Sequence, residues 1–448
     1  MPFPIQISLL AVLGAVVGAF INWAIYQWAI CQHRPISPFM KPRPDLLQED
    51  EDKEKLKQLG PRSGLDFVPI LGWFRLRRDA SILGKGCWVR PLLIEVAWAI
   101  GLPLFFLWQL NGGLIGVDPT TGLAAASTAM YSSWMTTWFW LQAILIALMF
   151  IATFIDFDER MIPDQVTVPG TIIALVAAAV FPWSRLPNLA ILPSLENIDF
   201  ATEATPGPWT TSNTGLLACM AIFVIWVFGL LPKIVPLREF KLGIAGNIKI
   251  MLASIVRPAR KTVCDLRTSK RSMPTMTRLY LGILLTGIIL IPVAWMGWMG
   301  PVQKVSLVCS FIGLGVAGGL IWGIRIVAGF ALGQEAMGFG DVTLMCMIGA
   351  FLGWQASLAA FVYSIMFAFV LAIILFVITK KSYLAFGPYL CMGALMALIR
   401  WPAVLKEFDH VFFLGPLLLL FFGGSLVLMA VLLPLIRWLK ESMLGVEE

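Results

Sequence analysis

The sequence predicts an all-α protein that crosses a membrane many times. Of its 448 residues, 59% are hydrophobic and 13% are charged, and the mean hydropathy is +0.84. A soluble globular protein carries about 25% charged residues, so this composition is typical of a multi-pass membrane protein. The apolar runs leave no stretch that has the composition of a soluble domain. Lipid offers the backbone no hydrogen-bonding partners, so we expect these runs to be helices of one bundle.

About nine to eleven transmembrane helices are predicted. A span needs about 20 consecutive apolar residues. The longer candidate runs lie near 5–28, 91–110, 133–155, 168–184, 215–236, 279–298, 305–330, 356–379 and 412–436, and two shorter ones near 342–354 and 386–400. The first run has no basic stretch before it and is longer than the core of a signal peptide. We therefore expect it to be retained as a transmembrane helix.

The charges of the loops predict which side of the membrane each loop faces. Loops 31–90 and 237–278 are rich in Lys and Arg, whereas 111–132 and 186–214 contain neither. Positively charged loops remain in the cytoplasm, so the N-terminus is expected outside and the C-terminus inside, in the cytoplasmic (inner) cell membrane. The basic loop 237–278 is expected to contact anionic lipid headgroups. No segment combines a basic face with interleaved aromatic residues, which argues against a nucleic-acid partner.

Two aspartates from distant parts of the chain are predicted at the same cytoplasmic boundary. Asp156 ends one predicted span, and Asp341 follows another, directly after Gly338 and Gly340. An ionisable residue at this depth is costly unless it is solvated, paired or used, so it indicates a functional site. The two glycines allow another segment to approach closely. Two neighbouring carboxyl groups can share one proton, which lets one activate a water while the other protonates a leaving amide.

Other classes of protein fit the same aspartates. A secondary transporter can carry paired carboxylates in the membrane, although it would be expected to show inverted repeats with interrupted helices near the midplane. A non-catalytic membrane protein of pilus or secretion assembly is a further alternative. Acidic residues also cap helices, which is an ordinary role for Asp158 and Asp164.

Three segments resemble the prepilin peptidases, a family of Gly-x-Gly-Asp intramembrane aspartic proteases. They are Ile155-Asp156 with Ile162-Pro163-Asp164, Met337-Gly338-Phe339-Gly340-Asp341 with Gly349–Trp354, and Phe386-Gly387-Pro388. The resemblance implies that Asp156 and Asp341 are the catalytic pair. It also implies that the substrates are type IV prepilins or pseudopilins, whose basic leader is removed at the cytoplasmic face for pilus assembly or type II secretion.

The resemblance also suggests supporting residues and a division of the chain. The supporting or substrate-binding candidates are Gly338, Gly340, Asp158, Asp164, Glu335, Phe386, Gly387 and Pro388. The acidic members of this set would help to receive the basic leader. The peptidase core is expected over 131–400, with loops 186–214 and 237–278 inserted into it, and 401–448 is expected to form a C-terminal helix and a cytoplasmic tail.

Residues 1–130 resemble the N-terminal region of the family without its zinc cysteines. The matching segments are Gly18–Asn22, Val68–Arg77 and Arg90–Glu95. Many members hold zinc with two Cys-x-x-Cys pairs in this loop, whereas here only Cys31 and Cys87 lie nearby. A closed zinc site needs four ligands, so we expect no zinc here. Hydrolysis by a pair of carboxyl groups also needs no cofactor. The family's second reaction, N-methylation with S-adenosylmethionine, usually accompanies these cysteines. Their absence argues against that reaction in this chain.

Overall fold

The computed structural model describes most of the predicted bundle. The described residues are 3–29, 63–80, 86–111, 128–181, 184, 186, 208–230, 273–332, 337–379, 385–413 and scattered positions between 420 and 432. Helices are the only regular structure in these segments. The prediction of an all-α, multi-pass membrane protein is confirmed.

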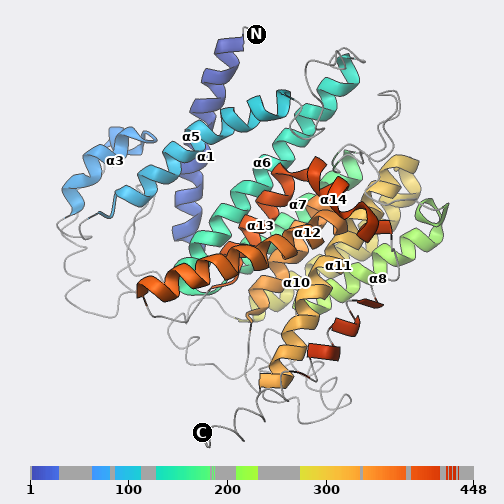
Figure 1. The fold of residues 1–448 in the computed structure, drawn as a ribbon. Helices are drawn as coiled ribbons and strands as arrows, with labels where there is room; N and C mark the ends of the chain where they lie inside the picture. The colour runs from blue at the N-terminus through green and yellow to red at the C-terminus, as the bar shows by residue number, and fades with distance from the viewer. Residues whose placement is uncertain are drawn as a thin grey trace, which may run out of the picture.

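A pair of helices forms the N-terminal part, α1 (Phe3–Trp28) and α5 (Val89–Leu110), which lie side by side in Figure 1. They approach closely at Gly14 and Gly18. A Cβ atom on Gly14 would lie 2.2 Å from the backbone oxygen of Trp98, so only glycine fits there. The described part of the connecting loop contains three short helices, η2 (Gly64–Phe67), α3 (Leu71–Leu76) and η3 (Arg77–Asp79).

The remaining helices form the core of the bundle. They are α6 (Thr128–Glu159), α7 (Asp164–Val180), η8 (Pro208–Thr211), α8 (Asn213–Leu230), α10 (Met273–Gly297), α11 (Pro301–Leu332), α12 (Phe339–Thr379), α13 (Gly387–Ile399) and α14 (Trp401–Phe413). The N-terminal pair contacts this core through α6. Figure 1 shows α11, α12 and α13 running through the centre of the bundle.

Small residues allow the central helices to pack with their backbones nearly in contact, as is common in membranes. A Cβ atom on Gly313 of α11 would lie 2.1 Å from the backbone oxygen of Gly349 on α12. Ser310 adds a hydrogen bond of 2.7 Å to the Ala350 carbonyl. On the other side of α12, a Cβ atom on Gly393 of α13 would lie 2.2 Å from the Ala360 oxygen. The middle of α12 is thereby held against both α11 and α13.

The described part of the chain divides the spans differently from the prediction. Within the described part of the chain, seven helices are long and apolar enough to span a membrane, or eight if α13 and α14, bent by 88°, form one span. The predicted segments 342–354 and 356–379 belong to one element, α12, with a kink at Gly353 (φ 82°, ψ 172°). Glycine adopts this positive φ without strain, which allows the chain to bend there.

Several predictions concern residues or properties that the described segments do not test. Most of run 412–436 and of loops 31–90, 186–214 and 237–278 falls outside them. The side of the membrane on which each terminus lies stays a prediction. The division into 1–130, 131–400 and 401–448 likewise stays a prediction.

Candidate active site

Asp156 lies in the last turn of α6 and is 5% exposed. The helix ends directly afterwards, where Arg160 takes a positive φ of 55°, and Pro163 then precedes the first residue of α7. One carboxyl oxygen of Asp156, Oδ2, accepts a hydrogen bond of 3.1 Å from the backbone N–H of Gly387. A Cβ atom on Gly387 would lie 2.5 Å from that same oxygen, so the contact requires glycine.

The Phe386-Gly387-Pro388 segment therefore has a definite position. Gly387 is the first residue of α13, and Pro388 follows it in the first turn, where a missing N–H costs nothing. Phe386 is half-buried directly before the helix. The segment brings the N-terminus of α13 against the end of α6, which fixes the direction in which the Asp156 side chain points.

Asp341 lies in the first turn of α12 and is 7% exposed. The backbone N–H of Gly338 donates a hydrogen bond to its carboxyl group. Gly340 packs against Ile162, in the link between α6 and α7, and a Cβ atom on Gly340 would lie 2.9 Å from the Ile162 Cβ. The two glycines of the segment thus have different uses, since one donates to the aspartate and the other allows close packing.

The fold brings Asp156 and Asp341 to one site. Their carboxyl groups are close enough to interact electrostatically, and both also interact electrostatically with the thiol of Cys391 on α13. Both side chains are almost fully buried. Two carboxyl groups in a confined site can hold and exchange a proton, which is the arrangement that acid–base hydrolysis of an amide requires.

Arg325 on α11 is a further residue of the site that sequence reasoning missed. Its Nε donates a hydrogen bond of 3.0 Å to the carbonyl of Met337. Its guanidinium lies 5.5 Å from the ring centroid of Phe339, and its charge acts on Asp341. A single arginine inside an otherwise apolar span is itself a signal of function, and this signal was available in the sequence.

The other predicted acidic residues have protein partners. Both carboxyl oxygens of Asp158 accept hydrogen bonds of 2.8 Å from Arg90 at the start of α5. Asp164 accepts a hydrogen bond of 2.8 Å from the hydroxyl of Tyr280. Glu335 lies outside the described residues. Asp158 and Asp164 flank the end of α6, but their charges are already engaged.

The three N-terminal segments that resemble the family meet at Glu95 on α5, which is buried. The Asn22 side chain donates a hydrogen bond of 3.1 Å to Glu95, and Trp73 Nε1 donates one of 2.8 Å. The backbone N–H of Ile70 donates a third. A buried carboxyl group with three donors fixes α1, α5 and the loop between them in one arrangement.

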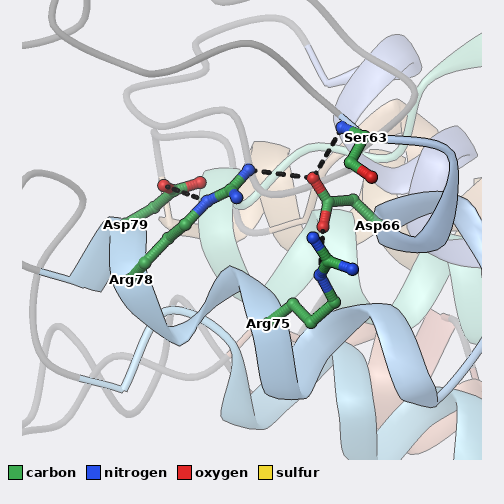
Figure 2. Close-up of polar contacts among 5 residues, drawn as sticks. All are labelled: Ser63, Asp66, Arg75, Arg78 and Asp79. Carbon is green, nitrogen blue, oxygen red and sulfur yellow. Dashed lines mark hydrogen bonds and ion pairs between the residues drawn. The ribbon is translucent and has the colours of Figure 1, made fainter.

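Asp66 is a second buried acid in the same loop (Figure 2). It accepts a hydrogen bond of 2.9 Å from the Ser63 backbone N–H and pairs with Arg78 at 2.8 Å and Arg75 at 3.2 Å. Burial alone would raise the pKa of Asp66, but the Ser63 N–H and the two guanidinium groups outweigh it, so the pKa lies below its usual value. Arg78 also lies 3.5 Å from Asp79.

The described residues contain no cluster of three or more His, Cys, Asp and Glu side chains that could hold a metal ion. Cys87 is half-buried, and Cys31 lies outside the described segments. The expectation that the protein binds no zinc stays a prediction.

Fold and site together define a polytopic helical membrane protein with a buried aspartate pair at one end of its bundle. Residues 270–373, which include Asp341, match the type IV leader peptidase family. This match and the two relatives described next support a peptidase of the prepilin type.

Two relatives are similar to this chain. The prepilin leader peptidase/N-methyltransferase of Neisseria gonorrhoeae is 28% identical over 259 residues, which cover 52% of this chain and 82% of the relative. The protein of the same description from Pectobacterium carotovorum subsp. carotovorum is 32% identical over 110 residues, or 23% of this chain and 39% of the relative. No solved structure matches the chain. These findings do not favour the transporter or the assembly protein.

Proposed function

We propose that the protein cleaves the leader peptide from prepilin-like or pseudopilin-like membrane substrates and that Asp156 and Asp341 carry out the cleavage. The observation that carries the proposal is the convergence of these two buried carboxyl groups, contributed by α6 and α12, at one site. The family and the names of both relatives support the substrate class.

The proposed reaction adds one water across the scissile amide bond. The ionised aspartate of the pair takes a proton from the water as the oxygen attacks the carbonyl carbon. The protonated aspartate gives its proton to the leaving nitrogen as the C–N bond breaks. The products are a new carboxyl group on the leader and a free amine on the mature chain. This mechanism needs two carboxyl groups and a water, so we propose that proteolysis requires no cofactor.

The protein's own contacts would position the pair for this chemistry. The Gly387 N–H holds the Asp156 carboxyl from one side, and the Gly338 N–H holds that of Asp341. Arg325 fixes the carbonyl of Met337, directly before the glycine segment. Fixed donors of this kind reduce the reorganisation that the reaction would otherwise require.

Acidic residues at the same end of the bundle would receive the basic leader. Asp158 is half-exposed but paired with Arg90, so a basic leader would compete with Arg90 for it. Asp164 and Glu335 are the other candidates, together with Phe386, Gly387 and Pro388 near the pair. We place the protein in the cytoplasmic (inner) membrane, with loop 237–278 on anionic lipid headgroups and without a nucleic-acid partner.

We do not extend the N-methyltransferase part of the relatives' description to this chain. The sequence lacks the Cys-x-x-Cys pairs that accompany that activity, and a site for S-adenosylmethionine stays without support. Mass measurement of the product's N-terminus decides this point, because methylation adds one methyl group to the new amine.

The test is co-expression with a candidate prepilin, comparing the wild type with Asp156→Asn and Asp341→Asn. The wild type is expected to remove the leader and each variant to leave it intact. Glu407→Gln is the matched control, because it likewise replaces a carboxyl group by an amide but lies on α14, in an exposed ion pair with Arg400, and it is expected to retain cleavage. An intact leader with the wild type would contradict the peptidase proposal for that substrate. Cleavage by either of the first two variants would contradict the pair.

A further inference from the structure

The loop segment Gly64–Asp79, here called the interfacial hairpin, exposes four large apolar side chains, here called its apolar edge. Leu65 and Leu71 are 59% and 65% exposed, and Val68 and Phe74 are exposed as well. These residues recur every third position, while Trp73 and Leu76 point inward and are buried. Four large exposed apolar side chains within one short segment, outside any span, indicate a surface that binds lipid or protein.

The hairpin lies at the depth of the membrane boundary. The Ile70 N–H and Trp73 Nε1 both donate to Glu95, which ties the hairpin to the second turn of α5. Glu95 lies about 7.5 Å further along α5 than Arg90, at about 1.5 Å per residue. Arg90 in turn is paired with Asp158 at the end of α6. The headgroup layer of each leaflet is about 5–7.5 Å thick, so the hairpin is level with that layer rather than out in the cytoplasm.

The exposed edge of the hairpin continues the lipid-facing surface of α5. The rings of Phe74 and Trp88 lie 6.5 Å apart, which places the hairpin against the first residues of α5. From there Val89 and Leu93 are exposed, and Ile100 and Leu104 carry the exposed apolar surface along the span. A transmembrane helix presents such side chains to lipid. Lipid would therefore also contact the hairpin's apolar edge.

The hairpin also carries the charges that suit an anionic surface. The guanidinium side chains of Arg75 and Arg78 are 43% exposed although both pair with buried Asp66 (Figure 2). The guanidinium group of Arg77 lies 3.9 Å from the centroid of the Trp88 ring, and Arg77 is exposed. Arginine beside an interfacial tryptophan is well suited to bind lipid phosphate.

We propose that the interfacial hairpin inserts its apolar edge, Leu65, Val68, Leu71 and Phe74, into the cytoplasmic leaflet, while Arg75, Arg77 and Arg78 bind anionic lipid headgroups. The hairpin would hold the N-terminal part of the protein at a fixed depth beside α5. This proposal concerns the lipid and does not depend on the peptidase reaction.

The test places a fluorescent amino acid at position 71 of the full-length protein in vesicles of neutral lipid or of neutral lipid mixed with anionic lipid. Quenching is measured with a nitroxide on the lipid near the headgroup and with iodide in the water. We expect strong quenching by the lipid nitroxide and at least threefold protection from iodide relative to the free amino acid. The same probe at position 104, on the lipid-facing side of α5, is the control for a lipid-facing position.

The charge part is tested by the lipid composition and by Arg77→Gln, which removes one charge without touching the ion pairs of Asp66. For this comparison the quencher is acrylamide, which is uncharged and is not repelled by an anionic surface; anionic lipid is expected to increase protection at position 71 at least twofold, and Arg77→Gln is expected to reduce that increase. Quenching by iodide but not by the lipid nitroxide would overturn the proposal, because the edge would face water. Quenching by neither would also overturn it, because protein would cover the edge. Equal protection in both lipids would overturn the role of the arginines.

Discussion

Replacing Gly387 by alanine is expected to disable the proposed active site while the bundle stays folded. The added Cβ atom would lie 2.5 Å from Asp156 Oδ2 and 2.9 Å from Ile162 Cδ1. Ordinary contacts of this kind begin at 3.4 Å, so the Asp156 carboxyl must move by about 1 Å. Its hydrogen bond of 3.1 Å from the Gly387 N–H is then lengthened or lost.

The expected loss of activity follows from this displacement. Misplacing a reacting group by about 1 Å costs on the order of 100-fold in rate, which corresponds to about 2.7 kcal/mol in the activation barrier. The fold should suffer much less, because the strain is confined to the first turn of α13 and can be relieved by movement of a side-chain carboxyl group. Gly387→Ala should therefore lower the cleavage rate far more than the thermal stability.

The assay measures the initial rate of leader removal in vesicles together with the thermal unfolding midpoint of each variant. Gly319→Ala is the neutral control, because nothing lies within 4 Å of its added Cβ atom. Gly349→Ala is the packing control, since its Cβ atom would lie 2.2 Å from the Gly313 oxygen, so stability should fall. A wild-type rate for Gly387→Ala would refute the reasoning that the position of Asp156 limits catalysis. A fall in the unfolding midpoint as large as that of Gly349→Ala, together with the loss of rate, would show that Gly387 is needed for the fold.

Three further outcomes are expected. Arg325→Leu removes the donor to the Met337 carbonyl and should lower the cleavage rate about 10-fold, as expected for a lost hydrogen bond from a charged group, with normal expression. Arg90→Gln breaks a half-exposed ion pair with Asp158, worth about 0–1 kcal/mol, so a double-mutant cycle on thermal unfolding should give a coupling no larger than that. Asp66 has a lowered pKa, so it stabilises the fold above its unfolded pKa of about 4, and this stabilisation is lost as the pH falls below that value. Proteolysis within 63–80 should therefore accelerate below pH about 4, and Asp66→Asn should remove this pH dependence.

The positions of the two aspartates could be predicted because several independent signals agreed. Loop charges placed Asp156 and Asp341 on one side of the membrane, and Gly338 and Gly340 marked a break between apolar runs. The structure brings the two side chains to one site. The contact with Gly387 could not be derived, because it depends on how α13 begins relative to the end of α6. A sequence pattern gives depth in the membrane but not the angle about a helix axis.

Other features could not be read from hydropathy for physical reasons. A window of apolar residues does not distinguish two spans from one kinked helix. The sequence therefore predicts two segments, 342–354 and 356–379, where the structure has one element, α12, with a kink at Gly353. The 88° bend between α13 and α14 is likewise not visible in hydropathy. Glu95 and Asp66 looked like ordinary charged residues. Their roles arise only when α1, α5 and the loop come together.

The two parts of the bundle are held together by different forces, and this determines how variants should be interpreted. In the core, α11, α12 and α13 approach through Gly313, Gly349 and Gly393, so the geometry around Asp341 depends on backbone packing that tolerates no added volume. In the N-terminal part, hydrogen bonds to Glu95 hold the hairpin, and losing one would leave a buried polar group without a partner. The Arg90–Asp158 ion pair between them is half-exposed and therefore weak. Damage to the hairpin should consequently remain local, so a variant there that abolishes cleavage would point to a role in substrate binding rather than to a general loss of the fold.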